Sequence, residues 1–236
     1  MRLHRFYIDK KIEGKEVFVK EERLLNQWRK VFRYKTGDRV ILFDGSGMEF
    51  IGELKDLKKE EVKIEILEER EGILPKKIGR EIILCQSLIK KDKMEWVVEK
   101  ATELGVSKIV PIISDRSEKK GFNIERARKI AVEASEQCGR ADVPEIREVE
   151  NLEASIKNYS SAVVFDSSGI TKGDPWPEPS GQRSPLVIFI GPEGGWTSKE
   201  IERFKKEKME IFSLGNLILR AETAAITALA TLILRD

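Results

Sequence analysis

Two hydrophobic patterns divide the chain. In the first, short apolar runs alternate with turn residues, and Val62, Ile64 and Ile66 alternate with charged residues as in a half-buried strand. Residues 22–34 carry apolar side chains at helical spacing. The strands predicted by this pattern are 6–8, 17–19, 40–43, 50–54 and 62–67. Several short strands with one helix indicate a small β-barrel.

The second pattern begins after the polar segment 68–80, which contains glycine and proline. From there strands alternate with helices, which is typical of a parallel α/β sheet. The predicted strands are 82–86, 106–113, 162–166, 186–190 and 209–214, and the helices open near Asp92, Asn123, Thr197 and Ala221. Pro111 places strand 106–113 at or near an edge of the sheet. We therefore expect two domains, residues 1–72 and residues 73–236.

The stretch that follows the apolar run 186–190 carries the strongest sign of a ligand site. It is a Gly-Pro-Glu-Gly-Gly turn at 191–195, where the glycines let a ligand approach the main chain. Thr197 and Glu200 then match a capping box, so a helix fixes the far end of the turn. A second turn, Gly215-Asn216, follows the next strand. Such turns at the carboxyl ends of parallel strands are the usual ligand position, although the glycines alone are also consistent with tight turns.

Two further segments are open to two interpretations each. The closing helix, residues 221–234, is apolar on most sides, so it is either central in its domain or shared with a partner chain. The Ser-, Gly- and Pro-rich segment 167–185 is either a mobile lid or a surface excursion, and we favour the excursion.

Several classes of site are excluded by missing patterns. The chain has neither a dinucleotide-binding G-x-G-x-x-G followed by an acid nor a phosphate-binding G-x-x-x-x-G-K-[ST]. Cys85 and Cys138 stand far apart without histidine nearby, so we expect no metal and no disulfide, and two buried thiols. Apolar runs are too short for a membrane span, and no signal-peptide core follows Met1, so we expect a cytoplasmic protein without a membrane partner.

Charge is distributed unevenly along the chain. The net charge is only +2, although 36% of the residues are charged. Residues 1–40 hold twelve Lys and Arg residues against six acids. This local excess fits either a surface that faces phosphates or a solvated charged face. The only histidine, His4, lies in this first part, so catalysis by an imidazole is not expected.

Two long motifs carry a resemblance to a known family. GPEGGW at 191–196 followed by LGNLILRAETAA at 214–225 resembles the paired signature of the RsmE family, the ribosomal RNA uridine N3-methyltransferases of the SPOUT class. The likeness extends to MEWVVEKATELGV (94–106), IVPIISDRSE (109–118), EASEQCGR (133–140) and a PUA-like stretch at 26–50. One departure is Asn26-Gln27, where relatives commonly have histidine.

The resemblance implies a fold and a reaction. It implies an N-terminal PUA-like β-barrel that binds RNA, an α/β SPOUT domain with a deep trefoil knot and a mostly parallel sheet, and a homodimer. It also implies methylation of N3 of uridine U1498 in 16S rRNA of the assembled small ribosomal subunit. The methyl donor would be S-adenosylmethionine, the product S-adenosylhomocysteine, and no metal would take part.

The resemblance also assigns site residues. Those that match the cofactor-binding loops are Asp166, Ile190, Gly191, Glu193, Gly194, Gly195, Leu214, Asn216, Leu217, Ile218 and Leu219. Those that match RNA-contacting positions are Arg5, Arg33, Arg116 and Arg140.

Three ionisable residues near the two loops are candidates for catalysis. Arg220 either stabilises charge on the uracil oxygens or clamps a phosphate, or it forms an ion pair with Glu222 at the helix start. Glu193 either acts as a base or holds its loop by accepting main-chain hydrogen bonds, and we favour the loop role. Two other functions remain open: methylation of a ribose 2′-oxygen or another base, and an RNA-binding protein without a cofactor.

Overall fold

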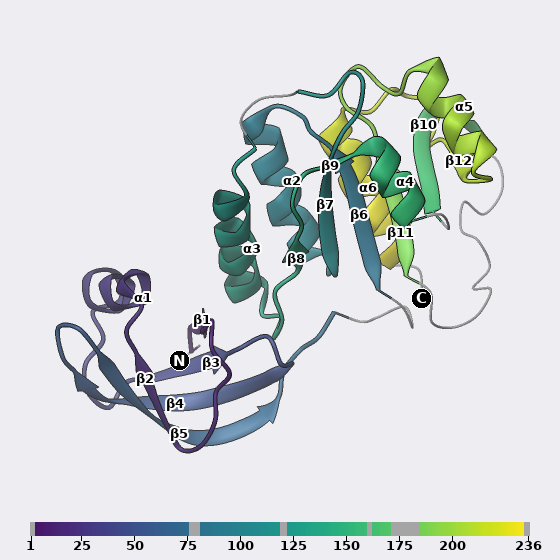
Figure 1. The fold of residues 1–236 in the computed structure, drawn as a ribbon. Helices are drawn as coiled ribbons and strands as arrows, with labels where there is room; N and C mark the ends of the chain where they lie inside the picture. The colour runs from purple at the N-terminus through teal and green to yellow at the C-terminus, as the bar shows by residue number, and fades with distance from the viewer. Residues whose placement is uncertain (1–2, 76–80, 119–121, 160–161, 171–184, 234–236) are drawn as a thin grey trace. The chain divides into compact units, whose positions relative to one another are not determined.

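The structure is a computed structural model that describes residues 3–75, 81–118, 122–159, 162–170 and 185–233 (Figure 1). The chain forms two compact units. Unit 1 contains Met1–Leu74 and Ser135–Val143, and unit 2 contains Pro75–Ala134 and Pro144–Asp236. The sequence did not predict that Ser135–Val143 would cluster with the first unit.

Unit 1 is a curled five-stranded sheet with a helical segment. Its strands are β1 (Arg5–Tyr7), β2 (Glu16–Val19), β3 (Arg39–Phe43), β4 (Met48–Leu57) and β5 (Val62–Glu71), in the order β1-β3-β4-β5-β2. β1 runs parallel to β3 and the other pairs are antiparallel. Helix α1 (Glu22–Asn26) continues into a π-helix, η1 (Gln27–Phe32), and buries Trp28 among the strands. The predicted small barrel with one helical segment is confirmed.

Ser135–Val143 joins unit 1 through main-chain and side-chain contacts. The Ala141 N–H donates to the Ile73 carbonyl at 2.7 Å, and the Glu136 carboxylate accepts from the Tyr7 N–H at 3.0 Å. A Cβ on Gly72 would lie 2.2 Å from the Ala141 Cβ, so the absence of a side chain permits this approach. These contacts are long-range in sequence, which explains why no local pattern predicted them.

Unit 2 is built on a parallel sheet. Its strands are β6 (Ile82–Ser87), β7 (Lys108–Ile113), β8 (Glu145–Ile146), β9 (Glu150–Asn151), β10 (Ala162–Ile170), β11 (Leu186–Ile190) and β12 (Glu210–Phe212). Their order is β12-β10-β11-β6-β7-β8, and β9 also pairs with β7. Pro111 falls at the gap between the pairings of β8 and β9, where its missing N–H leaves no ladder bond unmade. The predicted parallel sheet is confirmed, and the trefoil knot stays a prediction.

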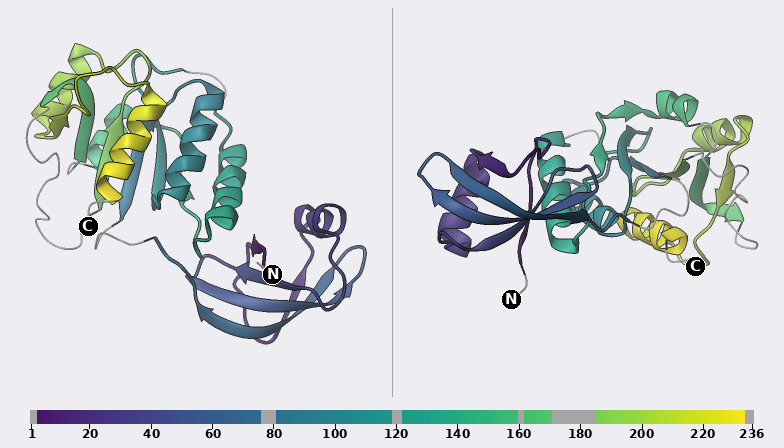
Figure 2. Two further views of the ribbon diagram at one scale, coloured as in Figure 1. Left: turned by 180° about the vertical axis from the view of Figure 1, so that it is seen from behind. Right: turned by 90° about the horizontal axis from the view of Figure 1, so that it is seen from below.

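Helices cover both faces of this sheet. α4 (Leu152–Asn158) and α5 (Ser198–Lys206) pack on one face, and α2 (Lys91–Glu103), α3 (Ile124–Cys138) and α6 (Ala221–Ile233) lie on the other (Figures 1 and 2). α6 lies against α2 and β11, and it buries Ala225, Ala228 and Leu229 completely. This helix therefore packs one buried stripe against its own unit and leaves Thr223 and Thr231 exposed, and its role at a partner chain stays a prediction.

Two expectations were wrong, and three elements of unit 2 were not predicted. Residues 167–170 extend strand β10, so this part of 167–185 is not a loop, and 171–184 lie outside the described residues. α4 and the short strands β8 and β9 were not predicted, because two-residue strands carry no periodicity. Cys85 is buried as expected, but Cys138, which lies in the segment Ser135–Val143 of unit 1, is exposed, so the second buried thiol was wrong.

The capping box of α5 provides a first test of the fold. The Thr197 hydroxyl accepts from the Glu200 N–H, and the Glu200 carboxylate accepts from the Thr197 N–H at 2.7 Å. Thr197→Ala should lower the free energy of unfolding by about 1 kcal/mol, because one N–H at the helix start loses its acceptor. Denaturant unfolding checks this value, and Ser198→Ala in the first turn is the control. Equal stability of Thr197→Ala and the wild type would contradict the assigned cap.

Candidate functional site

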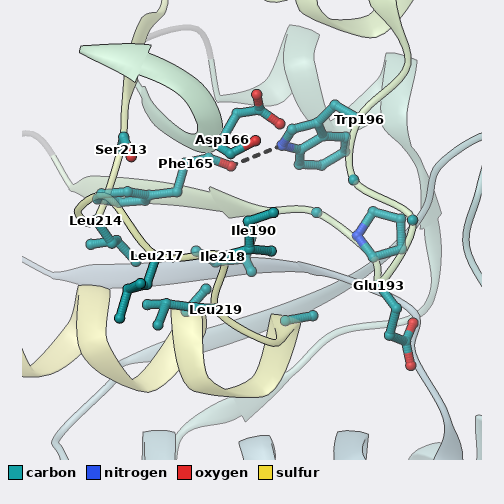
Figure 3. A pocket seen from close by; sticks show the side chains of 17 residues that line it. Phe165, Asp166, Ile190, Glu193, Trp196, Ser213, Leu214, Leu217, Ile218 and Leu219 are labelled. Atoms are coloured by element: carbon teal, nitrogen blue, oxygen red, sulfur yellow. Dashed lines mark hydrogen bonds between the residues drawn. The ribbon is translucent and has the colours of Figure 1, made fainter. Parts of the chain in front are cut away.

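A cleft opens in unit 2 at the carboxyl ends of β10, β11 and β12, and its volume is about 250 Å³. The start of α6 closes one side (Figure 3). The lining residues are Phe165, Asp166, Ser167, Ile190, Gly191, Pro192, Glu193, Gly194, Gly195, Trp196, Ser213, Leu214, Leu217, Ile218, Leu219, Ala221 and Ala224. The two turns expected to form one site therefore meet there. Of the predicted cofactor residues, only Asn216 is absent from the lining.

One wall of the cleft is apolar and unusually exposed. Leu217 and Ile218 are 81% and 91% exposed, although both line the cleft. Leu214, Leu219 and Ile190 lie beside them in Figure 3. Such exposure costs free energy in water, and an apolar ligand surface would remove it. The wall is suited to the faces of a flat aromatic ring.

The main chain of this wall is available to a ligand. Among the described residues, no N–H group of 214–219 donates to another main-chain group. Main-chain polar groups that are covered without a partner are costly, so a ligand that covers this segment must offer donors and acceptors. A purine has both along its edge.

The three glycines of the loop 191–195 differ in how much space an added side chain would have. A Cβ on Gly191 would lie 3.1 Å from the Trp196 indole, and one on Gly194 would lie 3.2 Å from the Arg116 Cδ. Gly195 has a φ of +65°, which side chains rarely adopt. The indole N–H of Trp196 donates to the Phe165 carbonyl at 3.1 Å and so ties the loop to β10 (Figure 3). The loop therefore depends on small residues and on one buried tryptophan.

The three candidate catalytic residues have separate environments. The Glu193 carboxylate accepts from the Lys90 N–H at 3.2 Å and points away from the apolar wall in Figure 3. Glu222 is buried and pairs with Lys93 at 3.3 Å. Arg220 is exposed just before α6, and within the described part of the chain it forms no ion pair. The structure therefore does not pair Arg220 with Glu222.

The four arginines expected to contact RNA also differ. Arg33 is exposed in unit 1 and ends η1 with a φ of 55°, whereas Arg5 forms an ion pair with the buried Glu49. Arg140 is 4% exposed and pairs with Asp142 at 2.8 Å. In unit 2, Arg116 is exposed and donates to the Gly194 carbonyl at 2.7 Å. Contact between RNA and Arg140 would require that its buried ion pair open.

Sequence reasoning missed two residues of the site. Trp196 lies in the GPEGGW motif, but only the fold shows that its ring supports Gly191. Lys93 had no signal, because its partner Glu222 lies far along the chain. Burial raises the pKa of the Cys85 thiol well above its usual value, so this thiol stays protonated and is a poor nucleophile.

Two further kinds of site were searched for. No cluster of histidine, cysteine or acidic residues that could hold a metal ion occurs in the described ranges. Across those same residues, none of the helices combines the length and the apolar character needed to cross a membrane.

Two family models match the chain. The model described as RNA methyltransferase domain matches residues 76–233, which covers most of unit 2. The model described as RNA methyltransferase PUA domain matches residues 29–67 in unit 1.

Individual relatives agree with these models. The chain is 30% identical to ribosomal RNA small subunit methyltransferase E of Rickettsia conorii, over 98% of this chain and 95% of the relative. It is 32% identical to the Bacillus subtilis protein of the same name, over 86% and 84%. A crystal structure of the Neisseria gonorrhoeae protein, bound to S-adenosyl methionine, covers 98% of this chain and 97% of its own, with a TM-score of 0.85 and 29% identity.

Proposed function

The chain belongs to the ribosomal RNA small subunit methyltransferase E family, and we propose that it methylates N3 of uridine U1498 in the 16S rRNA of the assembled small ribosomal subunit. The methyl donor in this proposal is S-adenosylmethionine. The observation that carries the proposal is the cleft, which an exposed apolar wall, a segment with unpaired main-chain N–H groups and a glycine-rich loop line together.

The residues around the cleft fit this cofactor. We assign Leu217 and Ile218 to the faces of the adenine, and the main chain of 214–219 to its edge. Asp166 lines the same cleft and can bind a hydroxyl at its rim. The bound cofactor supplies an electrophilic methyl group. The chain's own task is to hold the acceptor in line with that group, and positioning of this kind can remove roughly 7–11 kcal/mol from a barrier.

The acceptor nitrogen must lose its proton during the reaction. Arg220 is the cation that we assign to the uracil, because its permanent charge favours the anionic base. Glu222 pairs with Lys93, so we assign it to fixing the start of α6 rather than to proton transfer. Glu193 accepts a main-chain hydrogen bond, and we assign it to holding its loop.

RNA binding is assigned to both units. Arg33 and Arg116 are exposed and can reach a phosphate, whereas Arg5 and Arg140 are committed to carboxylates and would act by shaping the surface around them. We also retain residues 1–72 as the RNA-binding domain, residues 73–236 as the catalytic and dimerising domain, a homodimer, and the cytoplasm. A folded RNA would be read by its shape and phosphates.

Calorimetric titration with S-adenosylmethionine tests the enzyme against a protein that only binds RNA. We expect saturable binding with one site per chain. An absence of binding at high ligand concentration would remove every methyltransferase function for this chain.

The position of methylation needs a separate experiment. We expect that cells lacking the gene lose a methyl group at N3 of one 16S uridine and that the added protein restores it on isolated small subunits. Methylation of a ribose or of another base would replace the proposed substrate. Equally efficient methylation of free RNA would contradict the preference for assembled subunits.

Leu217→Ala tests the apolar wall directly. S-adenosylmethionine should bind about tenfold to a hundredfold more weakly, because a leucine that the ligand covers contributes roughly 1.5–3 kcal/mol. The free energy of unfolding should change little, since Leu217 is 81% exposed without ligand. Val31→Ala, at a side chain that is 69% exposed in unit 1, is the control and should leave affinity unchanged. Wild-type affinity in Leu217→Ala would exclude this residue from the site.

A further inference from the structure

The Gly194–Gly195 peptide group lies in the wall of the cleft and has little intrinsic restraint of its own. Neither residue has a side chain, so the peptide plane between them can rotate at low cost in an isolated loop. Both residues line the cleft, and the direction of this plane decides which polar group faces a ligand. The loop therefore needs contacts from outside to keep one orientation.

Hydrogen bonds hold this peptide at both of its ends. The Gly194 carbonyl accepts from the Arg116 Nη1 at 2.7 Å, and the Gly195 N–H donates to the Pro192 carbonyl at 2.9 Å. Because the peptide group is planar, its carbonyl and N–H cannot rotate independently. The Arg116 bond and the turn bond thus favour the same orientation.

The turn that carries Arg116 is itself fixed to the loop. Glu200, which is 6% exposed, accepts from the Asp115 N–H at 2.9 Å and from the Thr197 N–H at 2.7 Å. One buried carboxylate therefore joins the residue before Arg116 to the residue after Trp196. This contact fixes the backbone of the turn from which the Arg116 side chain reaches the Gly194 carbonyl.

We propose that Arg116 is a positioning residue for the cofactor, which holds the Gly194–Gly195 peptide in the orientation that binds S-adenosylmethionine. This inference rests on the proposed function. It is compatible with a phosphate contact, because a guanidinium has five N–H donors and the Gly194 carbonyl occupies one of them. The RNA contact and the loop contact can therefore occur together.

Calorimetry without RNA tests the inference on the full-length chain. Arg116→Ala should bind S-adenosylmethionine about tenfold more weakly, the loss expected for one hydrogen bond from a charged donor. Arg116→Lys should recover part of that loss, since an ammonium can still donate to a carbonyl. Arg147→Ala removes a half-exposed arginine that pairs with Glu145, and it should bind like the wild type.

Steady-state kinetics separate positioning from catalysis. At saturating RNA, Arg116→Ala should raise the KM for S-adenosylmethionine and leave kcat within about twofold, because the loop binds ligand in the ground state and the transition state alike. The melting temperature should match that of the wild type, since Arg116 is exposed. A variant with wild-type KM and affinity would overturn the inference while the proposed function stands. Failure of the wild type to bind the ligand would instead overturn the proposed function.

A double-mutant cycle gives a second test. A Cβ on Gly194 would lie 3.2 Å from the Arg116 Cδ, so Gly194→Ala should displace the guanidinium and weaken binding in the wild-type background. The same substitution should cost less in Arg116→Ala, because the Cδ contact and the hydrogen bond are already gone and only the contact with the Cβ of residue 116 at 3.3 Å remains. Fully additive effects would contradict a clamp between these two residues.

Discussion

Arg220→Ala should lower kcat by about tenfold to a hundredfold at saturating cofactor and RNA, because the cation that favours the anionic uracil is lost. Arg220 is exposed directly before α6, beside Leu219 of the cleft wall. Its side chain forms no ion pair within the described ranges, and Glu222 is instead occupied by Lys93 at 3.3 Å. The guanidinium is therefore available to a substrate. Single-turnover kinetics with saturating cofactor provide the measurement.

Affinity and pH distinguish this role from a structural one. Calorimetry should give Arg220→Ala a wild-type affinity for S-adenosylmethionine, because Arg220 is not part of the cleft lining. Higher pH should recover part of the lost rate, since solvent then removes the N3 proton without help from the cation. Arg220→Lys keeps the charge and should retain part of the activity, and Arg147→Ala is the surface control. Wild-type turnover in Arg220→Ala would remove the catalytic role.

Local sequence signals predicted most elements of the fold. The capping box at Thr197 and Glu200 is present, and Asn123 caps α3 by accepting from the Arg126 N–H at 3.0 Å. Alternating and continuous apolar runs also separated the barrel strands from the buried parallel strands. Each of these signals depends on neighbours within a few residues, so the sequence alone contains it.

Features that depend on distant residues were not predictable. The segment Ser135–Val143 begins within α3 and overlaps the motif EASEQCGR, so the sequence placed it with the second domain. It packs with unit 1 instead, because Gly72 leaves space for Ala141. The buried ion pair of Arg140 with Asp142 belongs to the same segment. A charged residue in a motif is consistent with RNA contact or with burial, and only the fold decides which environment it has.

The position of the candidate site was also predictable from local signals, whereas the contacts within it were not. Glycine-rich turns after parallel strands predicted where the cleft would be, because strand direction brings their carboxyl ends together. The individual roles were not predictable: Trp196 supports Gly191, and Arg116 reaches the Gly194 carbonyl from the turn after β7. Both contacts join segments whose separation along the chain gives no periodic signal.

Gly191→Val should nearly abolish binding of S-adenosylmethionine, with a loss in affinity of about a hundredfold or more, because overpacking costs roughly 1–3 kcal/mol and also distorts the cleft. A Cβ at this position would lie 3.1 Å and 3.2 Å from two atoms of the Trp196 indole. The indole cannot move away easily, since it is 6% exposed, donates to the Phe165 carbonyl at 3.1 Å and packs edge-on against Phe204 at 5.0 Å. The loop must therefore shift, and the cleft shifts with it.

Gly195→Ala is the matched comparison, because it alters the same loop without a collision. A Cβ on Gly195 would meet no atom within 4 Å, but the φ of +65° makes the backbone strained for any side chain. We expect Gly195→Ala to lose about 1 kcal/mol of stability and to bind the cofactor better than Gly191→Val does. Calorimetry and denaturant unfolding of both variants separate steric collision from backbone strain. If Gly191→Val bound the cofactor as tightly as the wild type, the loop at 191–195 would not form the wall of the cofactor site.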